Sequence, residues 1–381
     1  MGDRAGAANR TIRVHALVEG LNIGGAEALL AEFATVAPGV GIDYSVAALR
    51  SYGGAAGERL RRAGVDPEVL GIPALRPGAL VRVRRHLAEV RPDIVHTHLA
   101  DVDLLGSVAA RTLGIPAVAT LHVSRWGDRP REWLLDRLAS VALHTCASRI
   151  VAVSKASRDA YLTWSGERPE RVVVIPNGVG GRPAPAAGPG VRRQLGLGAD
   201  DLVVTMISSL RLEKGHDVAC AAMARVVPRV PRVRLLIVGD GPRRAEVAAA
   251  AAPLGDRVVL AGYRTDVMEV LAASDLVLHP SHHDAFPTTL IEAAAASVAV
   301  AATAVGGIPE IVEDGRTGLL FPAPPDPAAV AAAVASLLLD PVRRAELGRA
   351  ARIRFDAEFG ALRWARELRG LYDEVLAGAC A

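Results

Sequence analysis

The chain has 381 residues, of which 51% are hydrophobic, 22% charged and 4% aromatic, and its 44 Lys and Arg residues nearly balance its 41 Asp and Glu residues. With only three cysteines, this composition excludes a disordered tail protein, a disulfide scaffold and a dedicated nucleic-acid binder. At about 100 to 200 residues per domain, the length favours two domains, each large enough to bury its own core.

Short apolar segments alternate with longer helical patterns in both halves of the chain, which is typical of parallel sheets wound with helices. The strands that we expect in the first half are residues 12–18, 43–49, 94–98, 117–122, 150–153 and 172–176. Those in the second half are residues 202–208, 233–239, 258–261, 276–279, 299–302 and 318–321. The two sets predict an α/β protein with two Rossmann-like domains.

A segment rich in proline and glycine, residues 180–190, separates the two sets of strands. Because it cannot continue a helix or a central strand, we place the boundary there, with domains at residues 1–182 and 191–355. Helical patterns fill residues 356–381 and fit packing against either domain. The apolar positions of this terminal pattern, which starts one residue earlier, are Phe355, Phe359, Leu362, Leu368, Leu371, Tyr372 and Val375.

No apolar run reaches the roughly 20 residues that span a bilayer, and the first 20 residues lack the apolar stretch of a signal peptide. We therefore expect a cytoplasmic protein. A helix expected over residues 79–90 has one apolar face and an opposite polar face. The polar face carries Arg82, Arg85, His86 and Glu89. We interpret this face as solvated, and the alternative is a weak peripheral contact with the inner face of a membrane.

A glycine pair, Gly24 and Gly25, follows the first expected strand and opens a helical pattern. Glycines at such a junction let the backbone approach a phosphate, and free amides at a helix N-terminus favour an anion. The spacing does not match GxGxxG, and no acidic residue ends the second strand, which disfavours a dinucleotide oxidoreductase. A phosphate contact and a tight turn without a ligand are the two open interpretations.

Charged residues follow two expected strands of the second domain. Lys214 precedes Gly215 at a strand-to-helix junction, where a lysine is well placed to hold a diphosphate. Asp284 lies in a later loop, and Glu292 follows eight positions on, inside a helix. Carboxylates at these positions suit a ribose or sugar, since a carboxylate accepts two hydrogen bonds from a diol.

The loop between the two carboxylates leads into a helix whose first amides would face a phosphate. Those amides belong to Thr288, Thr289 and Leu290. A carboxylate stabilised by the helix dipole alone is the simpler interpretation of Glu292, but it does not account for Lys214 and Asp284 together.

Three clusters could suggest a metal site. Asp101 and Asp103 form a DxD sequence, but they follow a strand and start a helix, so we interpret them as helix caps. Histidine pairs at residues 96 and 98 and at residues 282 and 283 lack further ligands at metal spacing. We expect no bound metal.

Ten segments, in order, resemble the motifs of one enzyme family: NIGGAE, DIVHTHL, AVATLH, RIVAVSKAS, VVVIPNGV, SSLRLEKGHD, LLIVGDGP, VVLAGYRTDV, LVLHPSHHDAFPTTLIEA and AVGGIPEIVEDGRTGLLF. They cover nearly the whole chain. The sequence resembles the retaining glycosyltransferases of family 4, which have the GT-B fold. The resemblance implies two Rossmann-like domains facing each other across a cleft. It also implies transfer of a sugar from a nucleotide diphosphate sugar to an acceptor hydroxyl, with the anomeric configuration retained.

The resemblance, carried over position by position, implies that the second domain binds the donor. Glu292 would bind the donor ribose, Asp284 would face the donor sugar, and Lys214 would bind the phosphates. The backbone around Arg264 would contact the base. His122, which ends a strand of the first domain, would line the reacting sugar, although a structural role is open for a lone histidine.

In the same way, Gly24 and Gly25 would lie near the diphosphate. The chain departs from the family pattern at three positions. The arginine that commonly precedes the phosphate lysine by five positions is Ser209 here, with Arg211 as a candidate substitute. One lost charge-assisted contact would cost about 1.5 to 3 kcal/mol. Asp284 replaces a glutamate, and Ala285 replaces the following glycine, which bears on the donor-sugar preference.

The family implies a reaction without a cofactor or a metal, in which a donor phosphate oxygen takes the acceptor proton. Fixed hydrogen-bond donors at the phosphates would stabilise the charge that develops on the leaving diphosphate. We expect the acceptor to meet the first domain, where a short segment concentrates aromatic and cationic side chains that either grip a sugar or an anion or simply anchor a helix. They are Arg125, Trp126, Arg129, Arg131 and Trp133.

The acceptor class stays open among a saccharide, a lipid-linked saccharide and a small metabolite. Two other functions are compatible with the sequence: a GT-B-like nucleotide-sugar epimerase, and a non-catalytic subunit that binds a nucleotide sugar. The paired carboxylates argue against the epimerase, whereas Ser209 and Ala285 motivate the non-catalytic subunit.

Overall fold

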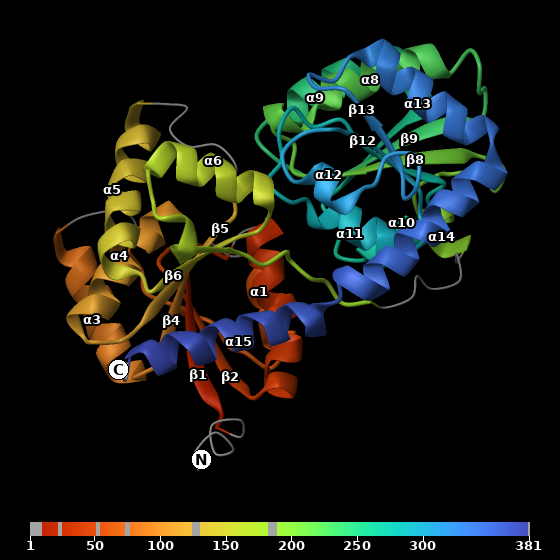
Figure 1. Cartoon of the computed structure of the whole chain (residues 1–381). Coiled ribbons are helices and arrows are strands. Elements are labelled where there is room, and N and C mark those ends of the chain that lie inside the picture. Colours follow the sequence, from red (N-terminus) through yellow and green to blue (C-terminus); the bar gives the residue numbers. More distant parts are fainter. Residues whose placement is uncertain are drawn as a thin grey trace. The chain divides into compact units, whose positions relative to one another are not determined.

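The computed structural model describes residues 10–21, 25–50, 54–72, 77–123, 130–181 and 189–379, except for the side chains at positions 26, 55, 77, 130–132 and 189. The chain divides into two compact units (Figure 1). The first unit combines Met1–Gly180 with Ala361–Ala381, and the second unit is Gly181–Gly360. Among the described residues, no helix is both long enough and apolar enough to span a bilayer.

The described residues of the first unit form a parallel sheet in the order β3-β2-β1-β4-β5-β6-β7. The strands are β1 (Ile12–Val18), β2 (Ile42–Ala48), β3 (Glu68–Val69), β4 (Ile94–His98), β5 (Ala117–Leu121), β6 (Arg149–Ala152) and β7 (Val172–Val174). The helices are α1 (Gly25–Val36), α2 (Ala55–Arg62), α3 (Pro77–Val90), α4 (Ala100–Thr112), α5 (Pro130–Cys146), α6 (Lys155–Ser165) and α15 (Ala361–Ala379).

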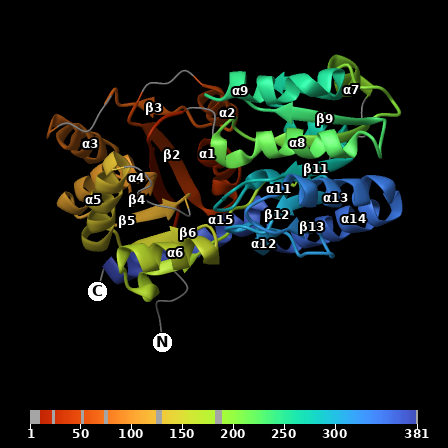
Figure 2. The same ribbon diagram turned by 90° about the horizontal axis from the view of Figure 1, so that it is seen from above.

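Helices cover both faces of this sheet, so most of the side chains on its central strands are buried. On one face, α1 and α15 pack against alternate residues of β1, and α3 and α4 pack on the opposite face, where Leu17 points. Figure 2 shows both layers from above. From α15, the side chains of Trp364, Leu368 and Tyr372 are buried in the core of the first unit.

The described residues of the second unit form a six-stranded parallel sheet in the order β10-β9-β8-β11-β12-β13. The strands are β8 (Leu202–Ile207), β9 (Val233–Val238), β10 (Val258–Gly262), β11 (Leu276–His279), β12 (Val300–Thr303) and β13 (Leu319–Phe321). The helices are α7 (Pro189–Gln194), α8 (His216–Val226), α9 (Arg244–Ala251), α10 (Val267–Ala272), α11 (Thr288–Ala295), α12 (Ile308–Ile311), α13 (Pro327–Leu339) and α14 (Pro341–Glu358).

In both sheets the strand order reverses once, between β1 and β4 in the first unit and between β8 and β11 in the second. At such a point, the loops leaving the two strands diverge to opposite faces and open a crevice at the carboxyl edge of the sheet, where ligands of open α/β sheets bind. The loops that follow these strands carry most of the residues that the sequence singled out.

All twelve predicted strands are present, with ends that differ by at most two residues, and the pairings are parallel. The short strand β3 was not predicted. Residues 182–188 of the expected boundary lie outside the described residues, while α14 continues to Glu358 within the second unit. The C-terminal apolar positions divide: Phe355 and Phe359 belong to the second unit, and Leu368, Leu371, Tyr372 and Val375 to the core of the first.

Candidate active site

The loops after β8 and β11 bring two predicted site residues into direct contact. Lys214 Nζ donates a hydrogen bond to Asp284 Oδ2 across 2.6 Å, and their side chains are 19% and 11% exposed. His279, the last residue of β11, lies on the other side of the carboxylate, with Nε2 at 2.9 Å from the same oxygen. Because an ionised carboxylate only accepts hydrogen bonds, the His279 Nε2 atom carries a proton.

The two loops are joined through their backbones. The amide of His282 donates to the carbonyl of Glu213 at 2.8 Å. Gly215 adopts a φ of +66°, and a Cβ at this position would lie 2.1 Å from the carbonyl oxygen of Pro280. Glycine is therefore needed both for the left-handed turn and for the close approach of the loops. This contact holds the two loops at the separation that brings Lys214 against Asp284.

The backbone of Asp284 is held by a third loop, which follows β12. The amide of Gly307 donates to the Asp284 carbonyl at 3.2 Å. At Gly306, where φ is +54°, a Cβ would lie 1.9 Å from that same carbonyl oxygen. The predicted sugar-facing carboxylate is thus fixed through its side chain and its backbone at once.

The electrostatics of this cluster favour an ionised Asp284. Burial alone would raise the pKa of this carboxyl, but the charge of Lys214 and the hydrogen bond from His279 outweigh burial and hold the pKa far below its ordinary value of 3.8. The site therefore presents a fixed negative charge beside a fixed positive charge at neutral pH. Such a pair can receive a sugar hydroxyl on one side and a phosphate oxygen on the other.

Helix α11 begins at Thr288 and carries the second predicted carboxylate, Glu292, which is half-buried one turn further on. The side chains of Thr288 and Thr289 are half-buried, and the Thr289 hydroxyl donates to the carbonyl of Ile207 at 3.1 Å. Leu290 is fully buried, and its amide donates to the Pro287 carbonyl at 3.2 Å. The Leu290 amide therefore has a protein partner, unlike the open amide that we expected for a phosphate.

The other predicted donor-binding residues lie in two places. Ser209 is half-buried after β8, and the side chain of Arg211, two positions later, is exposed. Arg264 follows β10, and its guanidinium pairs with Asp266 and reaches Gln194 at 3.4 Å. This ion pair restrains the half-buried side chain of Arg264.

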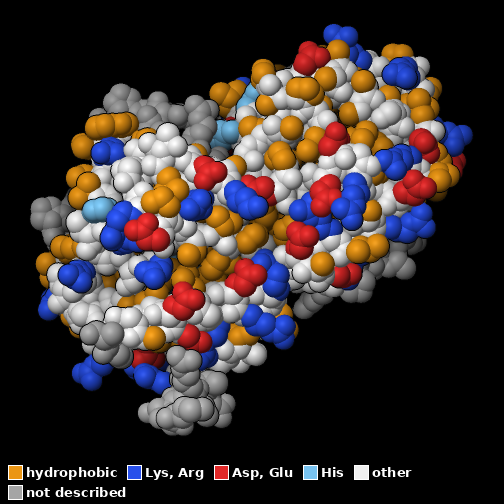
Figure 3. All heavy atoms as spheres, in the orientation of Figure 1, with side chains coloured by type: hydrophobic (Ala, Val, Ile, Leu, Met, Phe, Trp, Pro, Cys, Tyr) orange, Lys and Arg blue, Asp and Glu red, His pale blue; other side chains and the backbone are white. Residues whose placement is uncertain are grey.

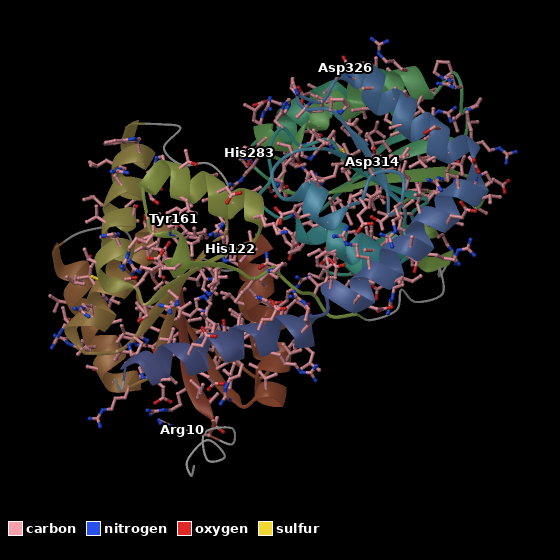
Figure 4. All side chains as sticks on the ribbon, viewed as in Figure 1. Arg10, His122, Tyr161, His283, Asp314 and Asp326 are labelled. Carbon is pink, nitrogen blue, oxygen red and sulfur yellow. The ribbon has the colours of Figure 1, made fainter. Side chains whose placement is uncertain are left out.

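In the first unit, His122 follows β5 directly and is labelled in Figure 4. Its Nε2 atom lies 2.9 Å from Nδ1 of His98, the last residue of β4. Gly25 is the first residue of α1 and is exposed, with open space where a side chain would be. Gly24 lies outside the described residues, as do Arg125, Trp126 and Arg129 and the side chain of Arg131, whereas Trp133 is exposed on α5.

The interpretation of Asp101 and Asp103 as helix caps is wrong. The residue that caps α4 is Leu99, and neither aspartate caps the helix: Asp101 pairs with Arg50, and Asp103 accepts a hydrogen bond from the Thr97 hydroxyl at 2.6 Å. In the described part of the chain, no three His, Cys, Asp or Glu side chains converge as metal ligands.

The polar face predicted for the helix of residues 79–90 also needs one correction. His86 is buried, with its Nε2 atom 2.9 Å from Nε2 of His15 on β1, whereas Arg82, Arg85 and Glu89 are exposed.

Sequence reasoning missed two residues at the carboxyl edges of the sheets. His279 was seen only as a strand end, although the final position of a parallel strand is where ligand-contacting side chains concentrate. His98 was set aside with His96 as an incomplete zinc pair. The alternation of a strand places positions 96 and 98 on one face, and that signal was available.

Comparisons with known proteins identify the family. The family model "Glycosyltransferase Family 4" matches residues 23–180, and "Glycosyl transferases group 1" matches residues 190–354. A D-inositol 3-phosphate glycosyltransferase of Thermobispora bispora is 31% identical over 310 residues, which are 75% of this chain and 71% of that protein. An alpha-maltose-1-phosphate synthase of Mycolicibacterium smegmatis is 32% identical over 317 residues, or 74% and 79%. The chain belongs to glycosyltransferase family 4.

Solved structures show the same fold as this family 4 glycosyltransferase. HepE of Anabaena, in complex with UDP and glucose, superposes with a TM-score of 0.84 at 24% identity, covering 94% of this chain and 99% of HepE. Sucrose-phosphate synthase of Thermosynechococcus elongatus gives a TM-score of 0.78 at 21% identity, covering 96% and 100%. The predicted GT-B fold, with two parallel-sheet α/β units, is confirmed.

Proposed function

We propose that this glycosyltransferase transfers a sugar from a nucleotide diphosphate sugar to an acceptor hydroxyl and retains the anomeric configuration. The observation that carries the proposal is the contact between Lys214 and Asp284 at the carboxyl edge of the second sheet. The contact holds a lysine ammonium, which can bind a phosphate, next to a carboxylate, which can orient sugar hydroxyls. HepE, which has this fold, was solved with UDP-glucose.

In this proposal, Lys214 stabilises the charge that develops on the leaving diphosphate, and the carboxylate of Glu292 binds the ribose. Asp284 orients the donor sugar, and His122 of the first unit contacts the reacting sugar. The acceptor proton passes to a donor phosphate oxygen, so that no protein nucleophile is required. We also propose that no metal is needed, and undiminished turnover in excess EDTA would support this.

The test uses the full chain with a panel of UDP-, GDP- and ADP-sugars, with release of nucleoside diphosphate as the readout. Lys214→Ala and Glu292→Ala are expected to lower turnover or donor affinity at least tenfold. Arg316→Ala is a control in the same unit, since Arg316 is an exposed cation that pairs with Glu313 and is not a predicted site residue. Wild-type turnover and donor affinity in both variants would refute the site assignment.

Two other functions are separated by the same assay. An epimerase would convert the donor sugar without any acceptor, and product analysis in the absence of acceptor detects this. A non-catalytic subunit would bind a donor without releasing nucleotide. As the first acceptors to try, we propose phosphorylated polyols and saccharides, because similar enzymes are named for D-inositol 3-phosphate and for alpha-maltose 1-phosphate synthesis.

We further propose a weak peripheral membrane contact through the outer helices of the first unit. Helix α5 exposes Leu134, Leu138 and Val141 along one stripe, and α3, which like α5 packs on α4, exposes Arg84 and Arg85. In Figure 3, hydrophobic and cationic side chains alternate over this part of the surface. Exposed apolar residues beside arginines suit an anionic lipid surface. Sedimentation with phosphatidylglycerol vesicles, compared with phosphatidylcholine vesicles, tests the contact.

A further inference from the structure

Three histidines lie in contact at the carboxyl edge of the first sheet. His96 and His98 point to the same face of β4, and their rings stack with centroids 4.4 Å apart and planes 28° apart. His98 in turn meets His122, whose ring centroid lies 5.2 Å away and whose Nε2 atom lies 2.9 Å from His98 Nδ1. The row therefore runs from the core of the unit toward the residue that we place at the reacting sugar.

The inner end of this row is held from two sides. His96 Nδ1 lies 2.6 Å from the hydroxyl of Tyr372 on α15, and His96 Nε2 lies 2.7 Å from the hydroxyl of Thr120 on β5. His96 and His98 are 3% and 6% exposed, and Tyr372 is completely buried. His96 cannot turn without losing two hydrogen bonds, so the ring of His98 rests on a fixed surface.

The charge state of the three histidines follows from their surroundings. Burial lowers the pKa of His96 to about 3 and that of His122 to about 4, and burial together with the two neighbouring histidines lowers the pKa of His98 well below 6.5. At neutral pH each ring carries one N–H and one lone pair. The hydrogen bond between His98 and His122 thus joins two neutral imidazoles.

This hydrogen bond leaves His122 a single ring nitrogen for a ligand. Its Nε2 atom is occupied by His98, and among the described residues its Nδ1 atom has no hydrogen-bond partner. The strand end also restrains His98 itself, because the next residue, Leu99, adopts a φ of +81°, which is uncommon for a residue other than glycine. The backbone turns sharply at Leu99 into α4, and His98 keeps its place facing His122.

We propose that His98 is a positioning residue of the transfer reaction: it orients His122 so that only Nδ1 of His122 faces a hydroxyl of the donor sugar. The inference rests on the proposed function, in which His122 contacts the reacting sugar. A hydrogen bond to one ring nitrogen fixes the orientation of a histidine, and it also fixes the tautomer once the partner atom is set as donor or acceptor, as in sites where the second nitrogen binds a ligand. His98 touches neither substrate, and it acts through His122.

Two substitutions separate the hydrogen bond from the packing. His98→Phe keeps an aromatic ring that stacks on His96 but removes Nδ1. His98→Asn places an amide where Nδ1 stands and restores a polar partner for His122 Nε2. The same unit offers a control in His15 on β1. His15 is buried, and its Nε2 atom lies 2.9 Å from Nε2 of another histidine, His86 on α3.

We expect His98→Phe to lower kcat about 10- to 100-fold while the Kd for the free nucleoside diphosphates UDP, GDP and ADP changes less than threefold by calorimetry. His98→Asn is expected to recover kcat to within about threefold of the wild type. His15→Phe is expected to lower the unfolding midpoint without lowering kcat. A kcat of His98→Phe within threefold of the wild type, or equal losses in the Phe and Asn variants, would overturn the proposal.

A second readout covers the case in which His98→Phe does not fold. In long-range ¹H–¹⁵N spectra of the imidazoles, His122 is expected to show one neutral tautomer in the wild type and in His98→Asn. A mixture of tautomers for His122 in the wild type would overturn the inference. The reference variants His122→Phe and Lys214→Ala distinguish a failure of the proposed site from a failure of the role of His98. If both variants keep full turnover, the proposed site is wrong. If both lose turnover and His98→Phe does not, only the role of His98 is wrong.

Discussion

The hydroxyl of Tyr372 meets Nδ1 of His96 at 2.6 Å, although the two residues are 276 positions apart in the chain. Both are buried, and the bond joins the helix α15 to the middle of β4. The bond holds His96 in place, and His96 is the inner member of the row of three histidines that continues through His98 to His122.

Tyr372→Phe is expected to lower the free energy of unfolding by about 1 to 3 kcal/mol, because it leaves a buried ring nitrogen of His96 without its partner. Urea denaturation measures the change. Tyr44→Phe is the matched control, since Tyr44 is buried in the same core and its hydroxyl makes no hydrogen bond to the described residues. Equal losses in the two variants would contradict the assignment.

Removing only the ammonium group of Lys214 is expected to lower the free energy of unfolding more than removing both charges of the Lys214–Asp284 ion pair. Lys214→Met leaves the Asp284 carboxylate, which is 11% exposed, beside a neutral side chain, and we expect a loss of about 1 to 3 kcal/mol in the free energy of unfolding. Lys214→Met combined with Asp284→Asn should recover part of it. A double-mutant cycle by urea denaturation without nucleotide measures the coupling, and strict additivity would speak against the ion pair.

The pH dependence of this pair has a defined sign. The pKa of Asp284 is lowered in the folded state, so its stabilising effect is complete above the unfolded value near 3.8 and fades as the pH falls further. The difference in stability between the wild type and Asp284→Asn should be constant from pH 5 to pH 8 and shrink below pH 4. A difference that stays the same from pH 7 down to pH 3 would be inconsistent with a lowered pKa at Asp284.

Acid should weaken the first unit below pH 6.5 through its buried histidines, and the raised pKa of the buried Asp103 carboxyl, about 7, offsets part of this loss. Burial lowers the pKa of His15 and of His96 to about 3, against an ordinary value of 6.5. Between these values the unfolded chain binds protons and the folded one does not, so stability falls as the pH falls below 6.5. Each buried histidine contributes up to about 1.4 kcal/mol per pH unit. Urea midpoints from pH 7 to pH 5 should decline, with a smaller slope in His15→Phe.

Gly215→Ala is expected to weaken donor binding about tenfold or more, because a Cβ would lie 2.1 Å from the Pro280 carbonyl and push apart the loops that carry Lys214 and Asp284. Gly196→Ala is a close control. Gly196 also has a φ of +66°, but nothing lies within 4 Å of the point that a Cβ would occupy there. It should lose about 1 kcal/mol of stability and keep its donor affinity in calorimetry. Similar affinities for the two variants would show that loop contact does not set the site.

The strands were predictable because most strands of a parallel sheet that is covered on both faces are short apolar segments, and each such segment can be recognised from its own sequence. β3 escaped because both of its residues are exposed and its two-residue length leaves no run to detect. The burial of His86 also escaped, since a helical periodicity describes one helix and contains no information on His15, its partner from β1.

The charged residues of the candidate site were found from residue type and position relative to the strands. Lys214 and Asp284 are 70 positions apart, and their contact depends on the backbone contact between two loops and on His279. The order of residues in the sequence does not show that these groups meet. The resemblance to family 4 supplied roles for single residues. Only the folded chain showed that His98 occupies one of the two nitrogens of His122.

The discontinuity of the first unit has a consequence for the order in which the protein matures. Its sheet is complete in sequence by Val174, but the helix α15 that covers one face of this sheet is synthesised only after the whole second unit has been synthesised. Until then, this face of the sheet has only α1 to cover it, and His96 lacks the hydroxyl of Tyr372. The second unit is one continuous stretch, so all of it is synthesised before the first unit is complete.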